Sequence, residues 1–348
     1  MTSYMILGGQ WGSEGKGLFA GYMAMQRKPD AVVSQFGPNA GHTWIEGDQP
    51  IVFKALPVGS VAKSVKDIYL GPGSVINPET LAKELNSLGP LLDGKRVWVH
   101  EAAAIVRPED VEAEMGTVTH IASTRQGTSE AMIRKIRRGG KYPAHEALRD
   151  LQVTVVPHNM YRALIRRSEC LQIEGSQGID LSINSGYLYP YTTSRDCTPS
   201  QVLADCGLHP MDLCAIIACI RTYPIRVGNI VGGNGLTIGT SGPCYTDQSE
   251  TSWKELGLTD EHTTVTKRVR RVFTFSSLQT INLLNEVKPT AIFLNFCNYM
   301  PEDKWRELMG WINTLASRPV VRWTGHGPKH TDIRAYESRR PEPTQFQE

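Results

Sequence analysis

The sequence lacks the features that mark secreted, membrane-spanning and nucleic-acid-coating proteins. Its seven cysteines form no CxxC pair and none precedes Cys170, which indicates reduced structural thiols in a cytosolic protein. No apolar run approaches the length that spans a bilayer, and the N-terminus has no secretory signal pattern. The formal net charge is only +2, which argues against a general nucleic-acid binder. We expect a soluble, cytoplasmic protein, in the host cytoplasm if a phage encodes it.

The chain also has no internal repeats and no low-complexity linkers, while its 348 residues are 40% hydrophobic, enough for a large packed core. Apolar stretches that predict strands alternate with helical patterns, starting with 4–9 (strand), 15–26 (helix) and 31–37 (strand). The apolar stretch in 212–228 fits a helix or a strand. This order predicts an α/β fold, a mainly parallel sheet with helices on both faces. We expect one catalytic domain over 1–335 and a flexible tail over 336–348.

A glycine-rich stretch follows the first predicted strand and reads LGGQWGSEGKGLFAG over 7–21. Such a turn into a helix offers backbone N–H groups to an anion, and Lys16 adds a point charge for a phosphate. A tight strand–helix turn is the plainer interpretation of glycines alone. The spacing is one residue longer than in the common P-loop, and Gly17 replaces the Ser or Thr that holds magnesium there. We therefore disfavour an ordinary P-loop NTPase switch.

Two further features bear on chemistry. The stretch FGPNAGHT places His42 in a glycine-flanked loop, where it can act as general acid or electrostatic partner, or have no role. Dense basic clusters lie at 134–141 and 266–271. In a nearly neutral chain such clusters meet small anions such as phosphates and carboxylates, or form a solvated helix face.

Taken together, GGQWGSEGKG and NAGHT resemble the corresponding loops of adenylosuccinate synthetase, a purine-biosynthetic ligase. The likeness continues in the family's order through STRQGTSEAMIRKIRR (123–138), IEGSQGIDLS (173–182), YPYTTS (189–194), TTVTKRVRR (263–271), LNFCN (294–298) and GHGP (325–328). Members of this family have the P-loop-related α/β fold expected above. They transfer the γ-phosphoryl of a nucleoside triphosphate to O6 of a purine nucleotide, after which aspartate attacks C6 and phosphate leaves. The family resemblance also implies a homodimer and Mg²⁺.

Site residues follow from the resemblance, position by position. The catalytic set is Ser13, Lys16, His42 and Gln177. The purine nucleotide would contact Ser13, Asn39, Thr124, Gln177, Thr193, Arg268 and, from the neighbouring subunit, Arg138. Aspartate would contact Thr264, Val265, Thr266, Arg268 and Arg270, because the arginine fork matches carboxylate geometry. The nucleoside triphosphate would contact Gly12, Glu14, Gly15, Lys16, Gly17, Gly41, His42, Thr43, Arg270, Asn295, Asn298, Gly325 and Gly327. Magnesium would be held by Ser13 and the Gly41 carbonyl.

Position 13 departs from the family pattern. The family has an aspartate there, which takes the N1 proton of hypoxanthine and binds magnesium. Ser13 is a very poor base and a weaker ligand, but it leaves room for the 2-amino group of guanine and can accept a hydrogen bond from it or from N1–H. This change is typical of the phage branch of the family, which joins aspartate to dGMP. The resemblance thus implies a ligase that makes a 2-aminoadenine precursor.

Two other departures lie near the predicted nucleotide loops. Asn298 replaces the aspartate that recognises guanine in GTP-dependent members, which favours ATP or dATP as phosphoryl donor. Lys267 stands where the family usually has glycine. Two alternatives stay open: an ordinary adenylosuccinate synthetase that uses IMP and GTP, and an inactive nucleotide-binding homologue.

Overall fold

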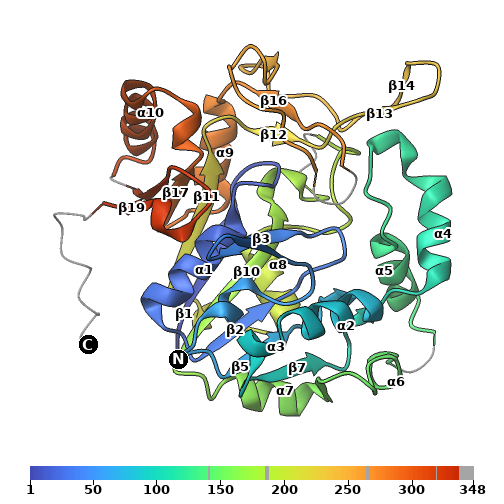
Figure 1. Ribbon diagram of the computed structural model, residues 1–348. Helices are drawn as coiled ribbons and strands as arrows, with labels where there is room; N and C mark the ends of the chain where they lie inside the picture. The colour runs from blue at the N-terminus through green and yellow to red at the C-terminus, as the bar shows by residue number, and fades with distance from the viewer. Residues whose placement is uncertain (140–141, 185–187, 264–266, 319, 337–348) are drawn as a thin grey trace.

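The computed structural model describes residues 1–139, 142–184, 188–263, 267–318 and 320–336 (Figure 1). Ten strands form one sheet in the order β19-β18-β17-β11-β1-β10-β2-β5-β7-β9, all parallel except β19, which is antiparallel to β18. The bounds are β1 (Thr2–Gly8), β2 (Ala31–Ser34), β5 (Asp67–Leu70), β7 (Arg96–His100), β9 (Thr154–Val156), β10 (Cys170–Gly178), β11 (Ala215–Arg221), β17 (Ala291–Asn295), β18 (Val321–Gly325) and β19 (Ile333–Ala335). The predicted α/β class with a mainly parallel sheet is confirmed.

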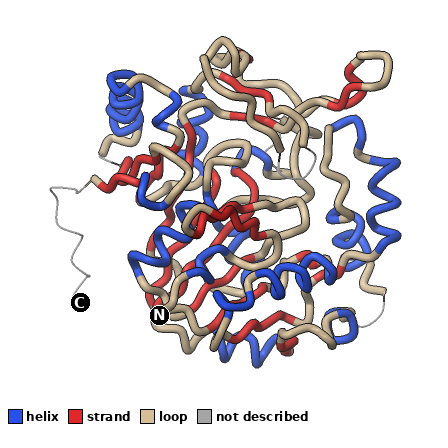
Figure 2. The backbone as a smooth tube through the Cα atoms, viewed as in Figure 1, coloured by secondary structure: helices blue, strands red, loops and turns tan. Residues whose placement is uncertain are grey.

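Helices cover both faces of this sheet, as the tube view shows (Figure 2). They are α1 (Lys16–Arg27), α2 (Pro78–Ser87), α3 (Gly89–Leu92), α4 (Pro108–Thr117), α5 (Thr128–Ile136), α6 (Ala144–Ala147), α7 (His158–Ile165), α8 (Pro199–Cys206), α9 (Ser277–Glu286) and α10 (Glu302–Leu315). Small sheets pair β3 (His42–Glu46) with β4 (Gln49–Phe53), β6 (Val75–Ile76) with β8 (Ala104–Ile105), β13 (Ile230–Val231) with β14 (Thr237–Gly239), and β16 (Arg271–Phe273) with β12 (Ile225–Arg226) and β15 (Glu250–Thr251).

The alternation of side chains along β1 divides the core into two layers. Tyr4 and Ile6 pack into one cluster with α1 and α2, while Met5 and Leu7 pack into another with α7 to α10. All four are buried, as a strand with a helical layer on each face requires.

Local signals set several element boundaries. The Asn77-Pro78 pair is a typical helix start: the Asn77 side chain accepts a hydrogen bond from Thr80 N, and Pro78 is the first residue of α2. The apolar stretch that fitted either a helix or a strand forms β11, buried in the centre of the sheet.

Two features differ from what the sequence suggests. The glycine-containing end of the motif IEGSQG (173–178) is typical of a turn, but β10 continues through it to Gly178, with an irregularity in its pairing with β1. Gln177 lies in this irregular part of β10 and has φ +62°. Such a bulge changes the direction in which a side chain points from the strand. Tyr336, placed in the tail, donates its backbone N–H to the Arg322 carbonyl at 2.8 Å. Positions 337–348 lie outside the described residues.

The carboxyl ends of the parallel strands meet at one edge of the sheet. The loops after β1, β2, β11, β17 and β18 all leave from this edge, where binding sites form in such folds. No helix in the described part of the chain is both long and apolar enough to cross a bilayer.

Candidate active site

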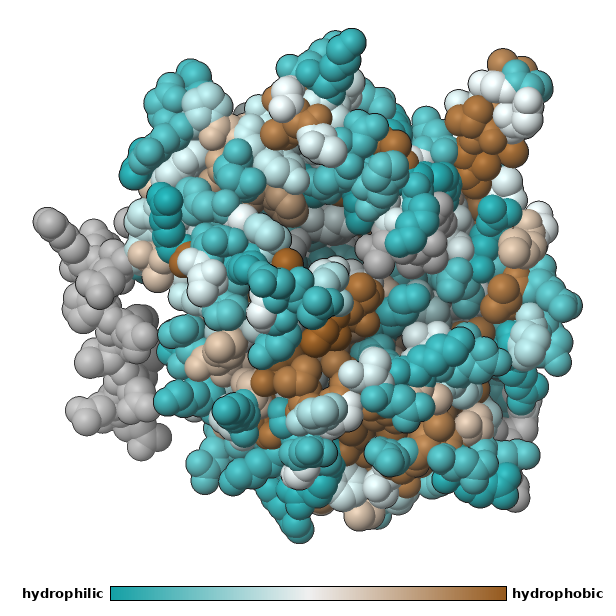
Figure 3. Space-filling model, viewed as in Figure 1, coloured by the Kyte–Doolittle hydropathy of each residue, from teal (hydrophilic) through white to brown (hydrophobic). Residues whose placement is uncertain are grey.

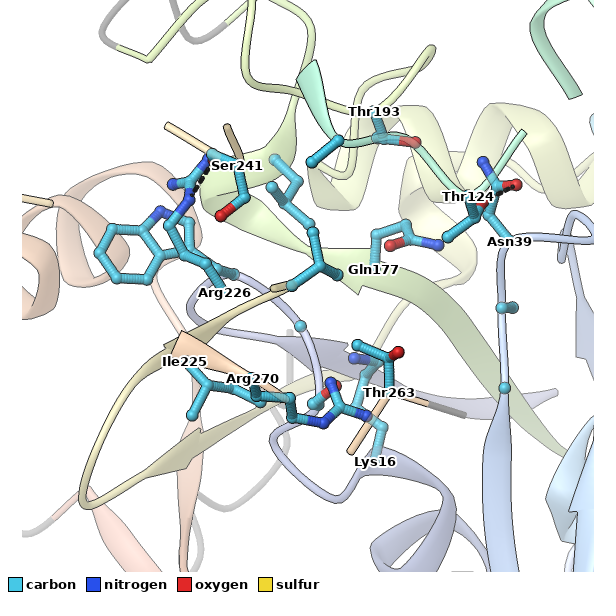
Figure 4. Close-up of a pocket in the computed structure, with 18 of the residues that line it drawn as sticks. Lys16, Asn39, Thr124, Gln177, Thr193, Ile225, Arg226, Ser241, Thr263 and Arg270 are labelled. Atoms are coloured by element: carbon cyan, nitrogen blue, oxygen red, sulfur yellow. Dashed lines mark hydrogen bonds between the residues drawn. The ribbon is translucent and has the colours of Figure 1, made fainter. Parts of the chain in front are cut away.

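A cavity of about 810 Å³ lies at this edge, lined by residues from the loops after β1, β2, β10 and β17 and from the segment 225–270. Figure 3 shows the molecule hollowed near the centre of the same face. Figure 4 shows side chains from these separate segments converging on the cavity. This volume is within the usual range of small-molecule binding sites.

The glycine-rich loop between β1 and α1 is organised by a buried carboxylate, Glu14. Its Oε1 accepts hydrogen bonds from Gln10 N at 3.1 Å and Gly12 N at 2.7 Å, and its Oε2 accepts from Lys16 Nζ at 2.8 Å. Glu14 has no exposed surface and Lys16 is 6% exposed. A buried charge of this kind is stable only when paired and hydrogen-bonded, so Glu14 fixes both the loop backbone and the ammonium group.

This arrangement refines the predicted phosphate contacts. The Gly12 N–H is already used by Glu14, so it is less available to an anion than the amides at the start of α1. Lys16 lines the cavity while it is bound to Glu14. Glu14 itself does not line the cavity among the described residues, and it acts on a ligand through Lys16 and the backbone.

The loop is fastened to the end of β17 by Asn295. Its Nδ2 donates to Glu14 O at 3.1 Å, and its Oδ1 accepts from Phe296 N at 2.8 Å. Asn295 is 3% exposed. Asn295 was predicted to contact the nucleotide. The structure shows that it also links the glycine-rich loop to the segment after β17. Gly15, which has φ +83°, lies directly against its amide.

His42 lies at the start of β3, stacked on Phe36 with ring centroids 4.4 Å apart. Burial, reinforced by the nearby Lys16 charge, lowers the pKa of His42 to about 3. The imidazole is therefore neutral at pH 7, which favours the electrostatic role over that of a general acid. Its Nε2 is buried and meets no hydrogen-bond partner within the described residues, so a ligand oxygen would satisfy it.

Elsewhere along the cavity, Asn39 Oδ1 accepts from Thr124 Oγ1 at 2.7 Å and from Thr128 Oγ1 at 3.2 Å. Gln177 extends toward Asn39 and Thr124 in Figure 4, and Thr193 lies above them. All except Thr128 line the cavity. Four of the residues predicted for the purine nucleotide are thus brought together from four segments.

Ser13 is exposed in the loop and has φ +59°, a left-handed conformation that is costly for a residue with a side chain. Arg270 Nη1 donates to its Oγ at 2.6 Å, and Arg221 Nη1 donates to its carbonyl at 3.2 Å. Burial lowers the pKa of Arg270 to about 10, so the guanidinium stays charged at pH 7. Position 13 therefore carries a neutral group in contact with a cation.

Sequence reasoning missed three charged residues here. Glu261 and Arg226 line the cavity, and Arg221 lies behind the loop with no exposed surface. Arg226, labelled in Figure 4, donates to Tyr191 O at 2.9 Å, and its guanidinium lies over the Trp11 ring. A charged residue that ends an apolar strand, as Arg221 does, could have drawn attention; Glu261 and Arg226 carry no such local signal.

Most predicted site residues line the cavity: Gly12, Ser13, Gly15, Lys16, Gly17, Asn39, Gly41, His42, Thr43, Thr124, Gln177, Thr193, Arg270, Asn295, Asn298 and Gly327. Others in the described chain do not. Arg268 instead donates to the Gly228 and Ala122 carbonyls at 2.9 and 3.2 Å, Gly325 packs against Asn295, and Arg138 is exposed beyond α5. Thr264, Val265 and Thr266 lie outside the described residues.

The residues present fit a magnesium ion only in part. No group of three or more acidic, histidine or cysteine side chains in the described ranges could hold a metal. Gly41 lines the cavity and offers a carbonyl of the kind magnesium accepts. Ser13 does not fit the predicted ligand role, because its Oγ already accepts from a cation that repels Mg²⁺.

Gly15 provides a test of the loop. A Cβ at this position would lie 2.1 Å from Asn295 Nδ2, in a backbone conformation unfavourable to side chains. We expect Gly15→Ala to weaken nucleoside triphosphate binding by about tenfold or more, by calorimetric titration, because the fastening to β17 must give way.

The matched control is Gly257→Ala, which has a similar φ of +69° but no neighbour within 4 Å of the added carbon. It should lose about 1 kcal/mol of stability and keep its nucleotide affinity. Equal losses of affinity in the two variants would contradict the loop assignment.

Comparisons with known proteins agree with this site. The adenylosuccinate synthetase family model matches residues 5–144 and 141–294. The N6-succino-2-amino-2′-deoxyadenylate synthase of Salmonella phage PMBT28 is 41% identical, over 94% of this chain and 96% of the phage protein. The adenylosuccinate synthetase of Archaeoglobus fulgidus is 33% identical, over 78% and 76%.

Among solved structures, the succinoaminodeoxyadenylate synthetase of cyanophage S-2L, bound to dGMP and to dATP as an energy donor, superimposes with a TM-score of 0.87. It is 38% identical and the match covers 97% of this chain and 96% of that one. The likeness thus extends over the whole fold that builds the cavity. The chain belongs to the adenylosuccinate synthetase family of carbon–nitrogen ligases.

Proposed function

We propose that this ligase joins L-aspartate to C6 of dGMP, with ATP or dATP as phosphoryl donor, to form N6-succino-2-amino-2′-deoxyadenylate. The observation that carries the proposal is the neutral hydroxyl of Ser13 in the loop that lines the cavity. The names of the phage relatives, which describe the same reaction product, support it.

The chemistry explains why the site combines phosphate-binding and carboxylate-binding groups. A ring carbonyl oxygen is a poor leaving group, so O6 of the purine first accepts the γ-phosphoryl group. The nucleoside diphosphate leaves, and the N1 proton passes to water or to the substrate's own carboxylate. The aspartate amine then attacks C6, the C6–O bond breaks and phosphate departs with the oxygen. The first step needs positioning and charge neutralisation.

Three groups would serve that step. Lys16 neutralises charge on the phosphates, the amides at the start of α1 bind them, and neutral His42 donates a hydrogen bond to the transferring group. Magnesium bound with the triphosphate supplies further charge neutralisation, and we assign the Gly41 carbonyl as its protein ligand. Arg270 would bind an aspartate carboxylate.

Ser13 would select the purine by space and hydrogen bonding. Its Oγ accepts one bond from Arg270, which leaves the hydroxyl proton and a second lone pair for the base. A carboxylate at this position would extend further and crowd the 2-amino group of guanine. An alcohol is too weak a base to take the N1 proton, so it contributes room and orientation.

Asn298 would set the choice of phosphoryl donor. It lines the cavity in a short helical turn, Cys297–Tyr299, directly after Phe296, which has φ +61°. Its amide offers both a donor and an acceptor, whereas guanine is best matched by a carboxylate that accepts twice. This chemistry favours adenine, in agreement with the dATP found in the cyanophage structure.

We also propose a homodimer in which Arg138 reaches the nucleotide of the neighbouring subunit. In the described protomer Arg138 is exposed and lies outside the cavity. A contact to bound phosphate would therefore come from a second copy of the chain.

The direct test incubates the protein with aspartate, Mg²⁺, ATP and either dGMP or IMP, and measures phosphate release and product mass. The proposal predicts turnover with dGMP. Turnover with IMP but not dGMP would identify an ordinary adenylosuccinate synthetase, and no turnover with either would indicate an inactive nucleotide-binding protein.

Substitution of Ser13 separates space from hydrogen bonding. Ser13→Asp should lower kcat/KM for dGMP by about tenfold or more and raise the relative use of IMP, because a carboxylate fills the gap and pairs with Arg270. Ser13→Ala keeps the gap, so it should slow the reaction while preserving the preference for dGMP. An unchanged preference in Ser13→Asp would contradict the spatial explanation.

The donor assignment is tested at Asn298. Asn298→Asp should raise the ratio of GTP use to ATP use by about tenfold, because the new carboxylate accepts from guanine N1–H and the 2-amino group. Asn298→Ala removes both the hydrogen-bond donor and the acceptor, so it should lower the use of ATP without raising the use of GTP. If the wild type and both variants prefer the same nucleotide to the same extent, Asn298 does not select the phosphoryl donor.

A further inference from the structure

Glu261 lies where three segments distant in the sequence meet. Its carboxylate accepts from Arg221 at the end of β11, with Nη2 at 2.6 Å and Nη1 at 3.2 Å, and from the Tyr299 hydroxyl at 2.9 Å. Arg270 Nε is 3.7 Å from its second oxygen, and Arg270 N donates to the Glu261 carbonyl at 2.8 Å. Glu261 thus holds two arginines at once.

The environment keeps this carboxylate charged. Burial alone would raise the pKa of Glu261, but Arg221, the Tyr299 hydroxyl and Arg270 together hold it below its usual value. Its side chain is 20% exposed, whereas that of Arg221 is fully buried. The Arg221 guanidinium also lies over the Phe296 ring, 3.9 Å from its centroid, so its position is restricted on two sides.

Both arginines donate a hydrogen bond to the same residue of the glycine-rich loop. Arg270 donates to the Ser13 hydroxyl and Arg221 to the Ser13 carbonyl. Ser13 has an unfavourable positive φ, a conformation that surrounding contacts must maintain. Because Arg270 occupies one lone pair of the hydroxyl, it also determines where the remaining proton and lone pair point.

We propose that Glu261 is a positioning residue for purine recognition: through Arg270 and Arg221 it fixes the backbone and the hydroxyl of Ser13 toward the base. This inference rests on the proposed function only in that a purine nucleotide faces Ser13. It does not depend on which purine that is. Although Glu261 lines the cavity, the role assigned here is indirect: its effect on the reaction passes through Ser13.

A double-mutant cycle tests this connection. kcat/KM for the purine nucleotide is measured for the wild type, Ser13→Ala, Glu261→Gln and the double variant, with whichever of dGMP and IMP the wild type turns over. Glu261→Gln alone should lower kcat/KM by about tenfold or more, and its effect should shrink to about twofold in the Ser13→Ala background, because the group it positions is gone.

Independent effects that multiply in the double variant would overturn the proposal. They would mean that Glu261 acts only through contacts of Arg270 with other substrates, or through the stability of the fold. If the wild type does not turn over dGMP, the proposed function is contradicted. The double-mutant cycle can then still be measured with IMP as the purine nucleotide, so the two failures are distinguishable.

Two further variants keep the result interpretable. Glu250→Gln removes a carboxylate that pairs with Arg271 at 2.6 Å but does not contact Ser13, and it should leave kcat/KM unchanged. If Glu261→Gln does not fold, Glu261→Asp replaces it in the cycle, since it retains the charge but draws the arginines out of position. Coupling to Ser13 is again the expected result, and multiplicative effects again contradict it.

Discussion

The structure of the site depends on one buried carboxylate, that of Glu14. It binds two backbone N–H groups and the Lys16 ammonium within a single short loop, and the cost of burying its charge is offset only if all three stay in place. Asn295 then ties the same loop to the end of β17. These contacts restrain the loop without a bound ligand, which is the preorganisation that the proposed phosphoryl transfer requires.

A second set of interactions is built on this fixed loop. Ser13 projects from it toward the cavity, while Arg270 and Arg221 approach from two different segments and are joined by Glu261. The consequence is a neutral hydroxyl at a defined place, surrounded by cations. In the proposed function, this is how the loop can lack a carboxylate at position 13 and still present an ordered group to the purine.

The sequence was sufficient to predict the α/β fold, the glycine-rich turn between the first strand and helix, and most residues around the cavity, because strand and helix periodicities are strong and the loop motifs are specific. It could not predict the bulge at Gln177, which arises from pairing between β10 and β1. Nor could it predict Glu261, whose partners Arg221 and Tyr299 are about 40 positions away in the chain on either side. Arg268, predicted to contact aspartate and the purine nucleotide, donates to the Gly228 and Ala122 carbonyls, which the sequence could not predict either. Such contacts are decided by tertiary packing, which leaves no local pattern.

The central claim is that a small neutral side chain at position 13 makes room for the 2-amino group of guanine. A crystal structure of the protein with dGMP bound tests it most directly, through the distances from the 2-amino nitrogen and N1 to Ser13 Oγ. The account predicts that at least one of these nitrogens lies within hydrogen-bonding distance of Oγ while Arg270 keeps its contact. A guanine bound with its 2-amino edge turned away from Ser13 would contradict it.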